Sequence, residues 1–313
     1  MLPPALSLSS PTPLAEWELQ SKIREALGDK LTGQIHVSFL NGRTETIFAH
    51  AGAVKQVYIR NHRVPDLNWE HPLIRFGRGT LEIKPMPARA MMFHKIMLEE
   101  ITPGAPQPAF TNQLRTMFDL TEHNVSPTLF HFQWARAQGF MLAGGKGIPI
   151  RHAVLLTQAG AVEGPEALKR MSAWEEARCQ FTVQRGDIKN QAWLEVHLNI
   201  LLEWYCARIL NHYGQLTGAV MTQSAVWKIR ALANEAGWNV EPLKTEVRDA
   251  SLFAHAAEAG EAYGKILSMI VGQIEPVIGS ALTQGILKQA NDATKGVYKT
   301  IAENFGLMGK ASV

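Results

Sequence analysis

The sequence contains little cysteine. Only Cys179 and Cys206 occur among its 313 residues. Two thiols are too few for a disulfide framework or an all-thiolate zinc site, and such sparse use is typical of a reducing compartment. We therefore expect a cytoplasmic protein that is held together by its apolar core.

The first residues lack the features of a secretory signal. They have no basic start, and four prolines interrupt their apolar residues, namely Pro3, Pro4, Pro11 and Pro13. A signal peptide needs an unbroken apolar stretch after positive charges. We expect residues 1–20 to form a flexible leader.

An excess of charge of one sign is also missing. The chain has 31 Lys and Arg against 28 Asp and Glu, scattered along its length. Nucleic-acid binders usually concentrate basic residues on one face, so we expect no nucleic-acid partner. Apolar residues make up 46% and charged residues 19%, a globular balance with room for two or three domains.

No recognisable catalytic motif is present. The sequence has no Gly-x-Ser-x-Gly elbow, no His-Glu-x-x-His and no phosphate-binding Gly-Lys-Ser/Thr turn. His94 and His197 fall at matching places in two predicted helices, but each lacks a partner at metal-ligand spacing, and Cys206 with His212 supplies only two ligands. We expect a protein that is not an enzyme, without a cofactor or metal site.

The chain contains an internal duplication. A meander of short strands runs through residues 33–39, 44–48 and 54–59, with a hairpin turn at Asn41-Gly42. A second meander runs through residues 129–132, 139–142 and 148–154. Each is followed by another strand (74–83 and 174–183) and an amphipathic helix (90–98 and 193–202). The order of elements is the same in both halves.

The second copy resembles a known family. It carries Gly164-Pro-Glu166-Ala167-Leu168, then Trp174-Glu-Glu and a strand ending Phe181-Thr-Val183. This pattern is similar to the PATAN-type domain of bacterial regulatory proteins, and the resemblance extends weakly to the first copy. We expect Trp174 and Phe181 to be buried in the second copy.

Together these patterns predict an α+β fold with tandem duplicated domains of antiparallel strands and helices, followed by an all-helical C-terminal module. A linker rich in proline runs from Thr102 to Pro108. The predicted boundaries are 1–20 for the leader, 21–108 and 109–213 for the two PATAN-like domains, and 214–313 for the helical module.

The helical module offers a candidate interface. Apolar residues recur at helical spacing between Lys265 and Lys288, where Glu275 is the only charge. Pro276 is expected to begin a new helix, and the segment from Leu252 to Phe305 should form two or three helices that bury a face against another chain or the duplicated domains rather than span a membrane. The candidate interface residues are Ile266, Ile270, Ile274, Val277 and Leu282.

Three functions remain open. The resemblance implies a non-catalytic signalling adaptor that acts by protein contacts, with a Ras-like GTPase or surface-motility motor as a separate chain. The first alternative is a structural subunit of a larger complex, such as a defence system, in which the helical end forms a homo-oligomer. The second is a diverged hydrolase. Copurification distinguishes the adaptor from the structural subunit, because the adaptor predicts a stoichiometric GTPase or motor and the subunit predicts a large homo-oligomer.

Overall fold

The structure is a computed structural model that describes residues 8–10, 12–64, 77–99, 107–110, 126–145, 148, 151–173, 178–243 and 246–307. The chain divides into two compact units. The first holds the first sheet and most of the second, and the second holds the C-terminal helices. Trp174 lies outside the described residues.

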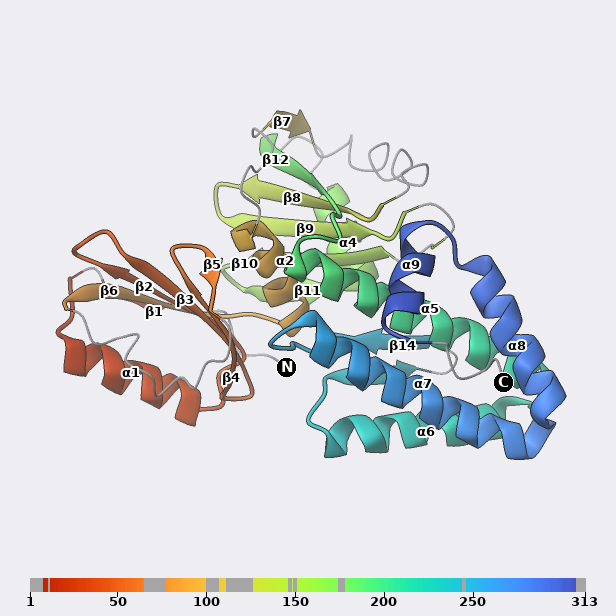
Figure 1. The fold of residues 1–313 in the computed structure, drawn as a ribbon. Coiled ribbons are helices and arrows are strands. Elements are labelled where there is room, and N and C mark those ends of the chain that lie inside the picture. Colours follow the sequence, from red (N-terminus) through yellow and green to blue (C-terminus); the bar gives the residue numbers. More distant parts are fainter. Residues whose placement is uncertain are drawn as a thin grey trace. The chain divides into compact units, whose positions relative to one another are not determined.

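The first sheet has six strands in the order β1-β6-β2-β3-β4-β5 (Figure 1). The Asn41-Gly42 hairpin joins β2 to β3, and Gly42 takes the positive φ of 78° that this tight turn requires. Its strands are β1 (Leu8–Ser9), β2 (Gly33–Phe39), β3 (Thr44–His50), β4 (Ala53–Ile59), β5 (His62–Arg63) and β6 (Gly79–Pro85).

Helix α1 (Glu16–Gly28) covers one face of this sheet (Figure 1). It begins where the Glu18 carboxylate accepts a hydrogen bond of 2.7 Å from the backbone N–H of Ala15. Leu19 and Ile23 on its inner side are fully buried against alternate residues of β2 and neighbouring strands. The period of two in the strands and the helical spacing in α1 thus meet in one apolar core.

The second sheet repeats the topology of the first. Its strand order is β11-β10-β9-β8-β12-β7, so β7 to β12 correspond one to one with β1 to β6. The predicted tandem duplication within an α+β fold is therefore confirmed. The strands are β7 (Gln107–Phe110), β8 (Thr128–Trp134), β9 (Ala137–Ala143), β10 (Arg151–Thr157), β11 (Gly160–Glu163) and β12 (Arg178–Arg185).

The helices after the sheets also correspond. α2 (Ala88–Glu99) follows β6, and α5 (Gln191–Thr217) follows β12. His94 and His197 each lie six residues after the first residue of their helix. In the second copy α4 (Gly164–Ala173) begins at the predicted Gly-x-Glu-Ala-Leu segment. Phe181 in β12 is only half-buried, so the prediction that it is buried was too strong, and its ring lies 6.3 Å from that of Phe132.

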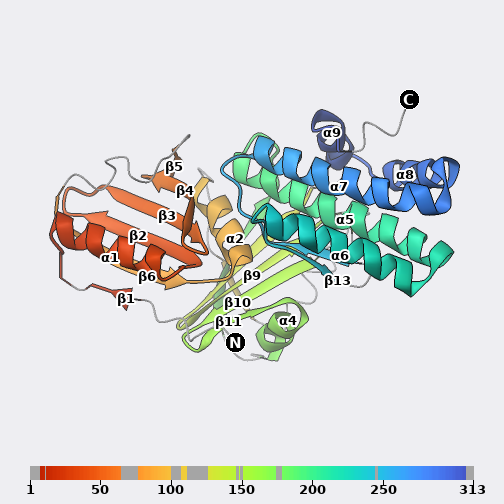
Figure 2. The same ribbon diagram turned by 90° about the horizontal axis from the view of Figure 1, so that it is seen from below.

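The C-terminal region is mainly helical. Figure 2 shows α5, α6 and α7 packed alongside one another. Its further helices are α6 (Ala219–Glu235), α7 (Ala256–Ile278), α8 (Ser280–Ala293) and α9 (Val297–Asn304). The prediction of a wholly helical module was wrong in one detail, because β13 (Val240–Leu243) and β14 (Glu246–Asp249) form an antiparallel hairpin.

The prediction that residues 252–305 form two or three helices is confirmed, because α7, α8 and α9 lie there. The expectation that Pro276 begins a new helix was wrong. Pro276 lies in the last turn of α7, and the new helix begins after Gly279. Near a helix end a proline removes only one hydrogen bond, whereas the positive φ of Gly279 ends the helix. Among the described helices, none is both long and apolar enough to cross a bilayer.

Candidate functional site

The predicted interface residues separate into two groups. Ile266, Ile270 and Ile274 are fully buried on the inner side of α7, which packs against α5. These three side chains therefore belong to the chain's own core, and they are not available to a partner. Val277 and Leu282 are 45% and 54% exposed, so they alone of the five face solvent.

The two exposed residues flank a sharp helix–helix corner. Gly279 joins α7 to α8 with φ 81° and ψ 159°, a backbone conformation that is essentially confined to glycine. Its N–H donates to the carbonyl of Glu275 at 2.8 Å, and its own carbonyl accepts from Thr283 Oγ1 at 2.9 Å. The corner is thus fixed by backbone geometry and by one threonine.

A second corner has the same construction. Gly218 joins α5 to α6 with φ 85° and ψ 176°, its N–H donates to Gly214 at 2.8 Å, and its carbonyl accepts from Thr222 Oγ1 at 3.0 Å. The sequences correspond, since Gly218-Ala-Val-Met-Thr-Gln matches Gly279-Ser-Ala-Leu-Thr-Gln. Sequence reasoning missed this short repeat, although the spacing of Gly, Thr and Gln could have shown it.

Both corners expose apolar side chains at equivalent positions. Two residues before the glycine lie Leu216 and Val277, and three residues after it lie Met221 and Leu282. All four are exposed, and we call them the corner surface. Figures 1 and 2 place the two corners at the same end of the helical unit.

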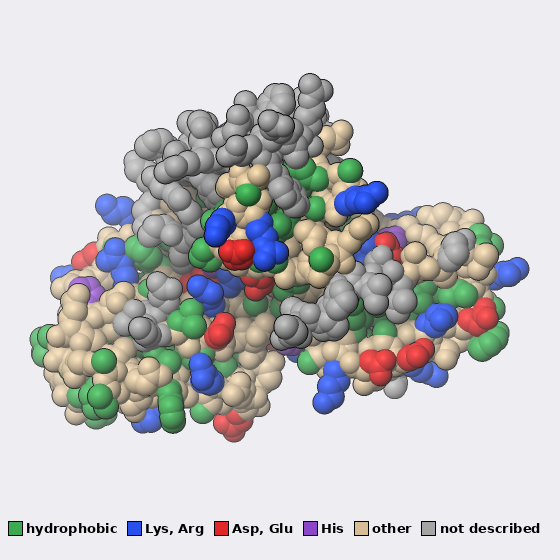
Figure 3. Space-filling view, turned by 180° about the vertical axis from the view of Figure 1, so that it is seen from behind, with side chains coloured by type: hydrophobic (Ala, Val, Ile, Leu, Met, Phe, Trp, Pro, Cys, Tyr) green, Lys and Arg blue, Asp and Glu red, His purple; other side chains and the backbone are tan. Residues whose placement is uncertain are grey.

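The surroundings of the corner surface carry almost no charge. No Asp, Glu, Lys or Arg occurs from Ile209 to Trp227, and Glu275 is the only one from Ile266 to Leu287. In Figure 3 this end of the helices, at lower left, shows hydrophobic and uncharged groups with few charged ones. Solvated surfaces usually mix in charges of both signs, so this surface is suited to protein contact.

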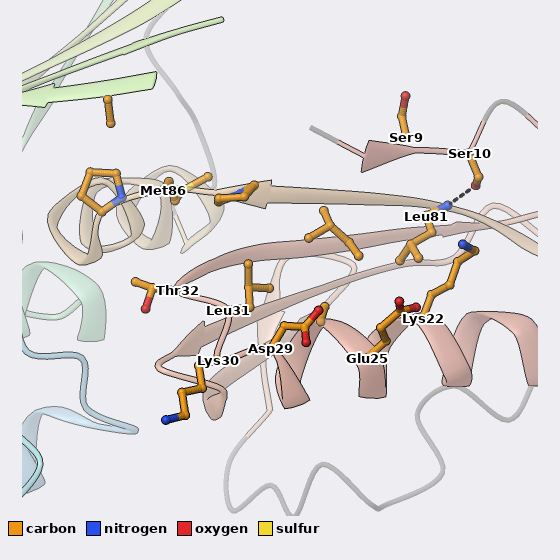
Figure 4. A pocket seen from close by; sticks show the side chains of 15 residues that line it. Ser9, Ser10, Lys22, Glu25, Asp29, Lys30, Leu31, Thr32, Leu81 and Met86 are labelled. Atoms are coloured by element: carbon orange, nitrogen blue, oxygen red, sulfur yellow. Dashed lines mark hydrogen bonds between the residues drawn. The ribbon is translucent and has the colours of Figure 1, made fainter. Parts of the chain in front are cut away.

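A groove beside α1 is the main alternative site (Figure 4). It has a volume of about 740 Å³ and an apolar floor that includes Leu31, Leu81 and Ile83. Its rim carries two cations and two anions, Lys22, Lys30, Glu25 and Asp29. A small apolar molecule would fit by volume. The balanced rim, however, favours neither an acidic nor a basic ligand.

Of the histidines singled out from the sequence, His197 is a core residue and His94 is half-buried. Burial lowers the pKa of His94 to about 3 and that of His197 to about 4. His197 Nδ1 donates to the carbonyl of Trp193 at 2.6 Å, and His94 lies with its ring 5.0 Å from that of Phe140. The described residues contain no group of three or more His, Cys, Asp or Glu that could hold a metal.

A buried polar network in the second unit has no counterpart in the predictions. Asp249 of β14 is fully buried and accepts hydrogen bonds from Asn199 Nδ2 at 2.8 Å, from the N–H of Ser251 at 2.9 Å and from the hydroxyl of Tyr263. Its own N–H donates to Glu203 at 2.9 Å. Burial raises the pKa of Asp249. The network ties the hairpin to α5 and α7.

Comparison with family models, with curated proteins and with solved structures found no match for this chain. The PATAN-type resemblance therefore remains a prediction.

Proposed function

We propose that this protein is a non-catalytic signalling adaptor that acts in the cytoplasm through protein–protein contacts. The corner surface is the observation that carries the proposal. It places four exposed apolar side chains on two rigid corners with almost no charge around them. Burial of such side chains in a partner is favourable by roughly 25 cal/mol per Å² of apolar area, whereas their exposure contributes nothing to the fold.

The partner class follows from the PATAN-type resemblance, which implies a Ras-like GTPase or a surface-motility motor. Two features of the chain agree with a cytoplasmic adaptor. Cys206 is a free, buried thiol, as expected in a reducing compartment. The corner surface lies in the helices that follow the duplicated sheets along the chain, so the sheets are not needed to form it.

Affinity purification of the full chain at its native level, followed by mass spectrometry and a size measurement, tests the proposal. The adaptor predicts one other protein in near-stoichiometric amount, and this protein should be a GTPase or a motor. A large homo-oligomer without a second protein would contradict the proposal and would support the assembly-subunit alternative.

A further inference from the structure

The groove beside α1, which we call the α1 groove, has two walls and a floor (Figure 4). One wall is a single side of α1, since four lining residues recur there at helical spacing. These residues are Lys22, Glu25, Ala26 and Asp29. The facing wall comes from residues 9–10 and from residues 85–87 at the end of β6. A concave site of about 740 Å³ with an apolar floor and a few polar groups is typical of small-ligand sites.

The charged groups of the helical wall are available to a ligand. Lys22, Glu25 and Asp29 are exposed, and among the described residues their side chains have no ion pair or hydrogen bond. In Figure 4 these three side chains point towards the strands, whereas Lys30 points away from them. The groove therefore presents free charges of both signs.

One end of the α1 groove offers hydrogen-bond donors. Figure 4 places Lys22 and Ser10 at this end. Ser10 Oγ accepts a hydrogen bond of 2.9 Å from the N–H of Leu81. Because the oxygen is the acceptor in this bond, the hydroxyl proton remains available to a ligand. An ammonium group together with a hydroxyl donor suits a carboxylate.

The other end of the α1 groove is anionic. Asp29 is the C-cap residue of α1, and Glu25 lies about one helical turn before it. The C-terminal end of a helix carries a partial negative charge, which also favours a cation. Since Lys30 turns its ammonium group away, this end suits the ammonium group of a ligand.

The spacing of the two ends indicates the length of the ligand. Lys22 and Asp29 are seven residues apart, which corresponds to about 10 Å along a helix. In an extended peptide each residue advances about 3.4 Å, so the two charged termini of a tripeptide are also about 10 Å apart. A rim with both signs thus matches a molecule that carries both signs, and the apolar floor matches apolar side chains.

We propose that the α1 groove binds a short apolar peptide of about three residues. Lys22 and Ser10 hold its free carboxylate, and Asp29 and Glu25 hold its ammonium group. This inference goes beyond the adaptor role, which concerns the corner surface. Its failure would leave the adaptor proposal standing, because the two sites share no residue.

Isothermal titration of the full chain with the tripeptide Leu-Ala-Leu tests the proposal. We expect binding with a Kd below about 1 mM. Acetylation of the peptide's N-terminus and amidation of its C-terminus should each weaken binding about three- to fivefold, since each removes one charge pair at an exposed rim. The pentapeptide Leu-Ala-Leu-Ala-Leu should also bind less tightly, because its termini are too far apart for the two ends.

Variants of α1 assign each terminus to its end of the groove. Asp29→Asn should remove most of the penalty of acetylation and keep that of amidation, and Lys22→Gln should do the reverse. The matched control Arg24→Gln changes an exposed charge on another side of α1 and should respond as the wild type does. All three positions are exposed, so thermal unfolding should show that the variants are folded.

Three results would overturn the peptide site. The first is no binding of Leu-Ala-Leu at millimolar concentration. The second is equal binding of the free peptide and of the peptide that is blocked at both termini. The third is an acetylation penalty in Asp29→Asn as large as that in Arg24→Gln.

Discussion

Several polar side chains of this protein are buried or half-buried, and their environments differ. His94, His131 and His197 lie among aromatic rings, and their Nε2 atoms have no hydrogen-bond partner among the described residues. Asp249, in contrast, is surrounded by donors. The three histidines are stable in these surroundings as neutral imidazoles, whereas Asp249 depends on its hydrogen bonds.

The buried histidines make stability depend on pH. Burial lowers the pKa of His131 and His197 to about 4, whereas in the unfolded chain these side chains titrate near 6.5. Between these values the unfolded state binds more protons, so the free energy of unfolding falls as pH falls. Each histidine contributes a slope of about 1.4 kcal/mol per pH unit.

Urea unfolding at several values between pH 6 and pH 4.5 measures this slope. His197→Gln removes one titrating group, and we expect its slope to be smaller than that of the wild type by about 1.4 kcal/mol per pH unit. An identical slope in the two proteins would show that His197 is not kept neutral by the fold.

Asp249 should be important for the stability of the second unit. Asp249→Ala leaves the Tyr263 hydroxyl and the N–H of Ser251 buried without this acceptor, which costs about 3 kcal/mol, whereas the Asn199 amide keeps its hydrogen bond to the backbone carbonyl of residue 249. Asp249→Asn keeps the shape and one acceptor oxygen, so we expect a smaller loss. Urea unfolding at pH 7 gives both values. A loss below about 0.5 kcal/mol for Asp249→Ala would mean that the network does not hold the hairpin.

At the scale of elements, the two helix corners depend on their glycines. An ideal Cβ at Gly218 or Gly279 meets nothing within 4 Å, so a steric clash does not disfavour alanine there. The positive φ of the backbone does. We expect Gly218→Ala and Gly279→Ala each to lower the free energy of unfolding by about 1 to 3 kcal/mol.

Two glycines inside the neighbouring helices provide matched controls for this prediction. Gly272 in α7 and Gly285 in α8 also have free space around an ideal Cβ, and neither has a positive φ. Gly→Ala there should be neutral or stabilising by up to about 1 kcal/mol. Equal losses at all four positions would contradict the account of the corners.

The sequence predicted the elements that have strong local signals. Alternation in β2 and the Asn41-Gly42 turn identified the first meander, because these patterns depend on local geometry, and the same order of short runs identified the second. The short edge strands β1 and β7 were not predicted, since their pairing depends on distant residues. The same applies to the hairpin β13–β14, whose Pro242 weakens its strand pattern.

The candidate site was only half predictable. Helical spacing identified the apolar residues of α7 and α8, but it could not separate Ile270 from Val277. That distinction depends on which side of α7 meets α5, and this is a tertiary contact. Trp227 and Val220 were missed for a related reason, because an apolar residue on a helix is read as core unless its exposure is known.

At the scale of the whole molecule, duplication and contact surface belong to different parts of the chain. The two six-stranded sheets repeat one strand order, whereas the exposed apolar residues of α6 and of the corner surface lie in the helices after them. Six of the ten large apolar side chains that are most exposed among the described residues lie between Leu216 and Leu282. Recognition is therefore expected at the helical end of the chain.

The most direct test of this account compares surface variants in the native-level purification. We predict that the double variant Val277→Asp and Leu282→Asp loses at least about 90% of the copurified protein, because two charges enter an apolar contact. Its thermal unfolding should match that of the wild type, and the control Leu40→Asp should retain the partner in full. Retention of the same partner in the same amount by the double variant would contradict the claim that the corner surface binds it.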